Sequence, residues 1–498
     1  MRVVLAGYNV DAEVLRRAES GAAVPREQLT PEVISAAYAR ISRDPRPVSA
    51  LRKEALEEVA RARSSNRKII FGMGHHSVAE HAVFNFDVLG LSRLAIEALE
   101  RFRLCSFTEK SQRYITLDHD FVLPEELSGT PHEKALQGLV AEQAKVYEEV
   151  VAALLERMKS GNPNLANDKN ALKLAEGSAK EDARYATILA TSGQLGLTAN
   201  ARNLEHVVRR LSGSPLAELR RLARLLFEAG ASVAPSLLLF TEPSAFDTQT
   251  HGALRALAAE LCGPPRGAIP GVIQVVRLAD APADCDARVA AALLASATGR
   301  SLAECRAVSG ALDRAQLHRL FSEAMRRMEF FDAPHREFEH VSFTFELVVS
   351  AACFAQLKRH RMATLTVCDY DPALGLTVPP TIAEAGLEPQ LRAVAARAEE
   401  LHEEIARIAP EAAPYALTNA HRRRVVATMN LRELYHFSRL REDAHAQWDI
   451  RALAGEMRRE IERVAPLGAL LLCGKDSYVE RYESVFGAPP KIDPAALP

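Results

Sequence analysis

Two stretches of the chain, far apart in sequence, alternate apolar and polar side chains with a period of two residues. Residues 341–347 and 84–88 both show this pattern, which is typical of a strand with one buried face. Residues 1–4 also have the pattern of a strand rather than that of a signal peptide. Apolar residues then recur at helical spacing over 91–102 and 347–357. Further long amphipathic helices are predicted over 133–158, 217–229, 384–408 and 448–464.

An arginine-rich signature occurs twice in the chain. The two copies read Arg101-Phe102-Arg103, seven residues, Ser111-Gln112-Arg113-Tyr114, and Arg359-His360-Arg361, seven residues, Asp369-Tyr370-Asp371. Matching blocks flank both copies, because 80–88 resembles 339–347 and 200–206 resembles 430–436. Three matching blocks in the same order indicate a tandem duplication.

The duplication predicts two tandem homologous domains of the α/β (α+β) class, each a small sheet with long helices. We place the first domain in residues 1–260 and the second in residues 270–498. The boundary between them is expected near 263–267, where glycine and proline interrupt the helical pattern on both sides.

The composition narrows the class of protein. A hydrophobic content of 48% supports a core in each half, and a net charge of −2 gives no general attraction to nucleic acid. No segment is apolar enough to span a membrane. The seven cysteines include no Cys-x-x-Cys pair, so neither a disulfide framework nor a metal site is indicated. We therefore expect a soluble, cytoplasmic protein that binds neither nucleic acid nor membrane.

The arginines of each signature fall where a predicted helix ends. Cations suit the negative end of the helix dipole, which is a purely structural explanation for them. A guanidinium also binds phosphate oxygens in pairs and stacks on flat heteroaromatic rings, so the same residues suit a phosphate-bearing ligand. The short basic run 421–424 is open to both kinds of explanation, as a solvated helix face or as a site for small anions.

Three motifs together resemble those of the flavin-dependent thymidylate synthases. The family signature is Arg-His-Arg, seven residues, then Ser, and each of the two copies above departs from it at different positions. Residues 74–81 are similar to the family's Gly-His-x-Ser/Thr…Glu-His motif, and residues 430–448 resemble its Asn-x-Arg…Leu-Arg…His-Ala-Gln pattern. The resemblance covers most of both halves.

This resemblance implies an α/β fold that forms a homotetramer, with each active site built where subunits meet. It implies FAD as the cofactor, NADPH as its reductant, and methylenetetrahydrofolate as the source of the C5 methyl group given to dUMP. The family uses no attacking cysteine. Instead, an arginine at the uracil edge stabilises the negative charge that develops on the ring.

The family's nucleotide-binding positions map onto both halves. In the second half they fall on Gln356, Arg359 and Arg441, and Arg441 takes the position of the activating, catalytic arginine. In the first half they fall on Glu109, Ser111, Gln112, Arg113 and Arg184. The reciprocal positions are replaced by Ala98, Leu211, Val367, Asp369, Asp371 and Pro414.

The flavin-binding positions that the resemblance implies follow the same division. They fall on Arg359, His360, Arg361, Asn430, Arg432 and His436 in the second half, and on Ser77 and Glu109 in the first. In the first copy of the signature, Phe102 replaces the histidine.

One type of composite site therefore keeps its anchors, whereas the other has lost most of them and gained two carboxylates that repel a phosphate. We interpret the chain as a fused pseudo-heterodimer with one working type of site, whose homodimer makes a pseudo-tetramer. Two alternatives stay open. One is C5-alkylation of another pyrimidine nucleotide, and the other is a nucleotide- or flavin-binding protein without catalysis.

Overall fold

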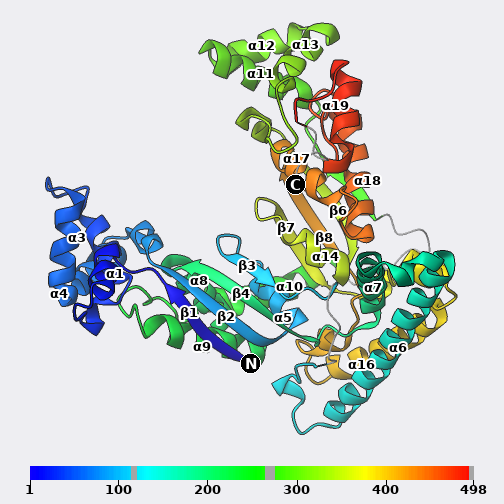
Figure 1. The fold of residues 1–498 in the computed structure, drawn as a ribbon, viewed down its shortest axis with the longest axis horizontal. Helices are drawn as coiled ribbons and strands as arrows, with labels where there is room; N and C mark the ends of the chain where they lie inside the picture. The colour runs from blue at the N-terminus through cyan, green and yellow to red at the C-terminus, as the bar shows by residue number, and fades with distance from the viewer. Residues whose placement is uncertain (114–119, 264–274, 493–498) are drawn as a thin grey trace. The chain divides into compact units, whose positions relative to one another are not determined.

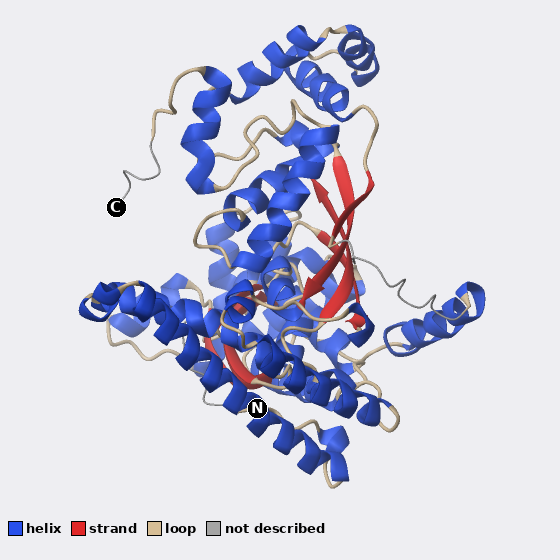
Figure 2. Cartoon of the chain, turned by 90° about the vertical axis from the view of Figure 1, so that its right-hand side faces the viewer, coloured by secondary structure: helices blue, strands red, loops and turns tan. Residues whose placement is uncertain are grey.

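The structure is a computed structural model that describes residues 1–113, 120–263 and 275–492. It forms two compact units, Met1–Gly267 with Pro389–Leu417 and Ala268–Glu388 with Thr418–Pro498 (Figure 1). Both are largely helical around one small sheet each (Figure 2). The predicted boundary at 263–267 lies almost entirely outside the described residues, as does Tyr114 of the first signature.

The first unit is built on an antiparallel sheet with the strand order β1-β2-β4-β3. Its strands are β1 (Arg2–Tyr8), β2 (Val83–Ser92), β3 (Ser106–Glu109) and β4 (Ser192–Asn200). Its helices are α1 (Ala12–Glu19), α2 (Glu32–Arg40), α3 (Val48–Glu57), α4 (Val59–Asn66), α5 (Arg93–Leu99), α6 (Pro131–Gly161), α7 (Lys169–Ala183), α8 (Ala201–Ser212), α9 (Ala217–Ala231), α10 (Ala245–Cys262) and α16 (Glu388–Ala406).

The second unit repeats this plan with the strand order β5-β6-β8-β7. Its strands are β5 (Val276–Asp280), β6 (Ser342–Ser350), β7 (Thr364–Tyr370) and β8 (Arg422–Asn430). Its helices are α11 (Cys285–Thr298), α12 (Leu302–Ala311), α13 (Arg314–Met325), α14 (Ala351–Leu357), α15 (Pro380–Glu384), α17 (Leu431–Arg441), α18 (Trp448–Val464) and α19 (Tyr478–Phe486).

The two alternating stretches are the central strands β2 and β6, as predicted. In β2, Phe84, Phe86 and Val88 are buried, whereas Asn85 and Asp87 are exposed. The strand predicted over 1–4 is the beginning of β1. Because both sheets have the same order and the same pairing, the predicted fold class and the repeat are confirmed.

The helices that follow these strands begin later than predicted. Residues 91–102 and 347–357 were expected to be helical throughout, but the strands run to Ser92 and Ser350 and the helices start just after them. Each serine caps its helix, since the Ala95 amide donates to Ser92 Oγ at 3.0 Å and the Cys353 amide donates to Ser350 Oγ at 2.9 Å. A serine side chain satisfies an amide that the first helical turn leaves without a partner, and this fixes the helix start.

The long helices agree with the sequence pattern, with one exception. The predicted helices over 133–158, 217–229 and 448–464 correspond to α6, α9 and α18. The helix predicted over 384–408 corresponds to α16 but starts later than predicted, because α15 ends at Glu384 and α16 starts at Glu388. Gly386 between them has a φ of 72°, a conformation that interrupts a right-handed helix. Among the described residues, no helix is both long and apolar enough to cross a membrane.

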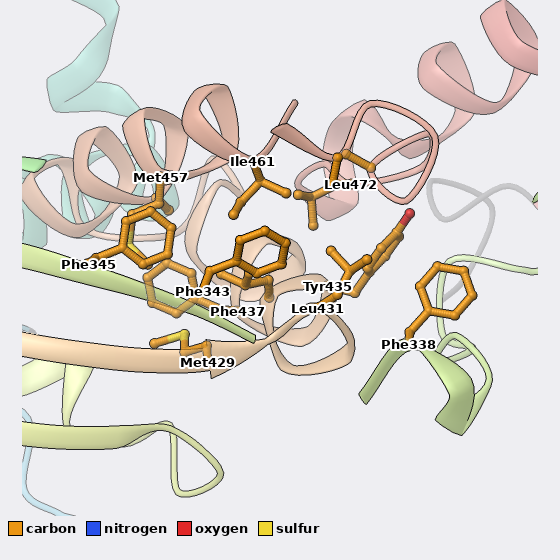
Figure 3. Packing of buried hydrophobic residues seen from close by; sticks show 14 of the residues in the cluster. Phe338, Phe343, Phe345, Met429, Leu431, Tyr435, Phe437, Met457, Ile461 and Leu472 are labelled. Carbon is orange, nitrogen blue, oxygen red and sulfur yellow. The ribbon is translucent and has the colours of Figure 1, made fainter. Parts of the chain in front are cut away.

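The core of the second unit lies between its sheet and the helices α17 and α18 (Figure 3). Phe343, Phe345 and Met429 come from the sheet, and Phe437 and Met457 come from the two helices. Truncation of a buried phenylalanine of this kind to alanine costs roughly 3–5 kcal/mol. This core holds the start of α14 and the length of α17 in place, and the candidate site lies on these two helices.

Residues 389–417 pack with the first unit although they follow most of the second sheet in sequence. The Leu189 amide donates to the Leu417 carbonyl at 2.8 Å, and the Tyr415 hydroxyl donates to the buried Glu218 carboxylate at 2.5 Å. Ser92 donates to Glu218 through both its amide and its hydroxyl. Glu218 therefore joins the start of α5 to a segment from the other half of the sequence.

Candidate functional site

Arg441, the last residue of α17, lies against the last turn of α14 and the residues that follow it. Its Nε donates to His360 Nε2 at 2.8 Å, and its Nη1 and Nη2 donate to the side-chain and backbone oxygens of Gln356 at 3.1 and 3.2 Å. The structure thus brings together three predicted site residues, of which Gln356 and Arg441 are 85 positions apart in the sequence. The three contacts hold the plane of the guanidinium in one orientation.

His360 is the buried member of this cluster, with only 3% of its surface exposed. Burial holds the pKa of its imidazole well below the ordinary value, and the neighbouring Arg441 and His436 act in the same direction. The imidazole is therefore neutral near pH 7 and can accept the hydrogen bond from Arg441. On its other side, His360 Nδ1 lies 3.5 Å from a carboxylate oxygen of Glu433, and burial raises the pKa of that carboxyl group.

The predicted flavin-binding residues of the second unit surround this cluster. Arg359, Arg361 and His436 are exposed, and the His436 ring centre lies 5.7 Å from that of His360. Asn430 caps α17 by accepting from the Glu433 amide at 2.8 Å. Arg432 is partly exposed; it donates to the Pro334 carbonyl at 2.7 Å and pairs with a Glu339 oxygen at 3.1 Å. Asn430 and Arg432 thus have structural contacts of their own, and their cofactor role stays a prediction.

The predicted residues of the first unit form a second cluster. Arg113 is paired with Glu181 and also donates through its amide to Ser111 Oγ at 3.1 Å. Arg184 is buried and donates from Nε to the Glu181 carbonyl at 3.2 Å. Burial lowers the pKa of Arg184, but a guanidinium keeps its charge in a protein. Arg113 and Arg184 therefore meet at Glu181.

The remaining predicted residues of the first unit lie outside the cluster of Arg113, Arg184 and Glu181. Glu109, at the end of β3, pairs with the buried Arg93 at 3.4 Å. Gln112 is half-buried, and Ser77 is exposed on a short 3-10 helix, His76–His81. Their positions leave their predicted roles as predictions.

Three charged residues of these clusters were missed by sequence reasoning. Glu433 lies eight residues, just over two helical turns, before Arg441 on α17. Glu181 precedes Arg184 by three residues, a spacing that places side chains together on a helix. Arg93 is hidden in an apolar pattern, and no local signal marks it.

Residues of the second copy of the signature loop make local contacts within the second unit. Tyr370 is buried in the sheet beneath Arg423, whose guanidinium carbon lies 4.0 Å from the ring centre. Arg423 also donates from Nε to the Cys368 carbonyl at 2.7 Å. The Asp371 carboxylate caps the next turn by accepting from the Ala373 amide at 2.9 Å. Tyr370 and Asp371 are thus used for local structure.

This arrangement corrects the interpretation of the basic run 421–424 as a helix face. Residues 422–424 begin the strand β8, and Arg423 is buried with 3% of its surface exposed. The run itself contains no apolar residue, so it shows neither a helical nor a strand period. The apolar positions that identify β8 as a strand come only after it.

Two long segments of the chain match a known protein family. Residues 26–236 and 277–467 each match the model of a family described as thymidylate synthase complementing protein. The chain belongs to this family. It contains the family's domain twice, which confirms both the resemblance and the tandem duplication.

Relatives match one or both of these domains. The UPF0159 protein Ta1429 of Thermoplasma acidophilum is 26% identical over 467 residues, which cover 86% of this chain and 92% of that protein. A flavin-dependent thymidylate synthase of Clostridium tetani is 29% identical over 217 residues, 43% of this chain and 83% of that enzyme. The corresponding enzyme of Pyrococcus abyssi is 32% identical over 142 residues, 28% of this chain and 49% of that enzyme.

Two solved structures each match about half of the chain. The flavin-dependent thymidylate synthase of Helicobacter pylori, complexed with FAD and dUMP, matches with a TM-score of 0.30 and 18% identity over 49% of this chain and 100% of that chain. The UMP/dUMP methylase PolB of Streptomyces cacaoi, bound with 5-Br dUMP, matches with a TM-score of 0.31 and 20% identity over 47% of this chain and 91% of that chain.

Proposed function

We propose that this protein is an enzyme that methylates dUMP to dTMP with FAD as cofactor, methylenetetrahydrofolate as carbon donor and NADPH as reductant. The observation that carries this proposal is the guanidinium of Arg441, held by Gln356 and His360 inside a segment that matches the family. The names of the sequence relatives, flavin-dependent thymidylate synthases, support the activity and the cofactor.

Arg441 is the proposed activating residue. A pyrimidine that reacts at C5 accumulates negative charge on its ring, and a fixed cation at the ring edge stabilises that charge. Because the guanidinium is already oriented by its two neighbours, little reorganisation is needed when the charge develops. Arginine does not lose its own proton, so it acts by charge and hydrogen bonding alone.

The phosphate and sugar of the nucleotide are assigned to the remaining anchors. Gln356 and Arg359 come from the second half of the sequence, and Glu109, Ser111, Gln112, Arg113 and Arg184 come from the first. Arginine forks suit the phosphate. We therefore propose a composite site that takes residues from both halves, as the family resemblance implies.

The flavin is assigned to the residues around His360. Exposed Arg359, Arg361 and His436 offer cationic and hydrogen-bonding groups that fit a flavin dinucleotide, and Arg432 and Asn430 border them. Ser77 and Glu109 complete the proposed set. Bound there, the flavin would supply the redox chemistry, while the protein supplies orientation and charge.

The reciprocal type of site is proposed to be inactive. Asp369 and Asp371 stand where the working loop has Ser111 and Arg113, and they would repel a phosphate. The use of Tyr370 and Asp371 in local contacts supports this loss. The chain then acts as a pseudo-heterodimer, and its homodimer as a pseudo-tetramer with two working sites.

The function is tested by incubating the purified full chain with FAD and recording the absorbance of bound flavin. Release of tritium from C5-labelled dUMP, with NADPH and methylenetetrahydrofolate present, then measures the reaction. Release from labelled UMP instead of dUMP would assign the protein to another pyrimidine nucleotide. Failure to bind FAD and to release tritium from either nucleotide would overturn the proposal and favour a binding protein without catalysis.

A further inference from the structure

The duplication provides an internal comparison for the Arg441 cluster. The matched motifs align Gln356 and His360 with Ala98 and Phe102, and they align Glu433 and Arg441 with Asn203 and Leu211. All four polar residues of the cluster are thus replaced in the first half. Glu433, which no family motif singled out here, has been lost together with the three residues that contact one another.

One ring contact at these positions is similar in the two halves, although Phe102 is only partly buried whereas His360 is buried. The Phe102 ring centre lies 5.5 Å from that of His206 in an edge-on contact, and the His360 ring centre lies 5.7 Å from that of His436 in a similar contact. An aromatic hydrocarbon ring therefore fills the place of His360 in the first half. The histidine is not needed to fill space, so its nitrogens require another explanation.

The hydrogen bonds fix where the imidazole proton lies. Because His360 Nε2 accepts from Arg441 Nε, the proton of the neutral ring must be on Nδ1. Nδ1 lies 3.5 Å from a carboxyl oxygen of Glu433, and among the described residues neither of these two buried atoms makes a hydrogen bond, so the carboxylate acts on the Nδ1–H tautomer through electrostatic attraction. With the other tautomer, an N–H of His360 would point at an N–H of Arg441. Glu433 thus favours the tautomer that can hold Arg441.

Burial of Glu433 and His360 destabilises the folded protein, so their retention requires a functional reason. Glu433 has only 7% of its surface exposed and His360 only 3%. A buried carboxyl group and a buried imidazole are both less favourable than apolar residues of the same size. The first half has made that replacement for the histidine, where Phe102 stands. Retention of both polar groups only beside Arg441 indicates that they act on Arg441.

We propose that Glu433 and His360 are positioning residues for Arg441. Glu433 selects the Nδ1–H tautomer of His360, and His360 Nε2 then fixes the plane of the Arg441 guanidinium at the edge of the substrate ring. The side chain of His360 therefore acts toward Arg441, while its exposed neighbours are left to contact the cofactor. The consequence for catalysis rests on the proposed function, but the consequence for Arg441 does not.

The test uses the full chain and substitutions taken from the chain itself. His360→Phe introduces the residue of the first half and removes the acceptor, whereas His360→Gln keeps an acceptor oxygen. Glu433→Gln removes the negative charge with little change of shape. Glu346→Gln is the matched control, because Glu346 is an exposed carboxylate of β6 that pairs with Arg277.

The first readout does not depend on activity. In the protein without FAD, the Nε–H resonance of Arg441 is identified as the signal that Arg441→Lys lacks. We expect His360→Phe to lose the slow solvent exchange of this proton, His360→Gln to retain it, and Glu433→Gln to broaden or shift the signal. An unchanged signal in both His360→Phe and Glu433→Gln would overturn the proposal.

The second readout separates positioning from binding. In the dUMP methylation assay, Glu433→Gln and His360→Phe should lower kcat by about tenfold or more relative to the wild type, while KM for dUMP changes little. His360→Gln should have a kcat close to that of the wild type. Wild-type kcat in Glu433→Gln would also overturn the proposal. If no variant and no wild type reacts but the Arg441 signal behaves as expected, the proposed function fails and the positioning of Arg441 stands.

Discussion

Replacing Arg441 with lysine keeps the positive charge and removes the planar guanidinium. The guanidinium reaches His360 and two oxygens of Gln356 at distances from 2.8 to 3.2 Å. A lysine ammonium is one nitrogen and cannot reach these acceptors at the same time. Loss of two hydrogen bonds from a charged donor costs roughly 3–6 kcal/mol if nothing replaces them.

Water reduces this cost, because Arg441 is only partly buried. We therefore expect Arg441→Lys to lower kcat by ~100-fold, which corresponds to about 2.7 kcal/mol in the activation free energy. Flavin binding should persist, because the named contacts of Arg441 reach only the buried His360 among the predicted flavin-binding residues and not the exposed Arg359, Arg361 or His436.

The assay is release of tritium from C5-labelled dUMP under single-turnover conditions, with flavin content followed by absorbance in the same samples. Thermal melting of both proteins controls for a general loss of structure. Near-normal turnover in the lysine variant would refute the activating role of Arg441. Loss of flavin together with turnover would show instead that the substitution disturbs the whole site.

Three further predictions concern the nucleotide anchor Arg113, the second signature loop and the buried His360. Arg113→Ala should weaken dUMP binding by about tenfold or more in calorimetric titration. Asp369→Ala and Asp371→Ala should leave affinity and a stoichiometry of one nucleotide per chain unchanged, so half-stoichiometric binding in the Asp369 variant would contradict the single working site. In the folded protein, the pKa of His360 is far below its ordinary 6.5. As the pH falls, the His360 imidazole is therefore protonated first in the unfolded chain. The free energy of unfolding then decreases below about pH 6.5, by at most ~1.4 kcal/mol per pH unit. His360→Gln should therefore lose less of its urea midpoint than the wild type between about pH 7 and pH 5, and equal losses would argue against a buried neutral histidine.

The strands and the long helices were predictable because their burial is periodic along the sequence. Phe84, Phe86 and Val88 all point to one side of β2, and a period of two residues makes this visible without coordinates. The helix starts were predicted too early because apolar residues continue through Ser92 and Ser350. At those positions a single capping hydrogen bond, not the apolar pattern, decides where the strand ends.

The candidate site was predictable only where a motif named its members. Gln356 and His360 were identified from the second copy of the signature and Arg441 from another motif, and the structure shows that Arg441 contacts both. Glu181 and Glu433 belong to no motif used here, and their contacts are made to residues whose approach depends on tertiary packing. The local sequence pattern does not show which carboxylate side chains are buried in the folded protein.

The loss of the cluster in the first half has a physical direction. Leu211 is part of the hydrophobic core of its unit, and Ala98 and Phe102 pack against that core. With Leu211 in place of the arginine, a glutamine or histidine at the partly buried positions 98 and 102 would have no guanidinium to donate to it, and each hydrogen bond lost in this way costs roughly 0.5–1.5 kcal/mol. Apolar replacements remove that cost and add packing. Three of the four positions thus carry apolar residues in the first half, whereas the counterpart of Glu433 is the polar Asn203. Gln356, His360 and Arg441, which share hydrogen bonds, are the positions whose polar groups are lost together.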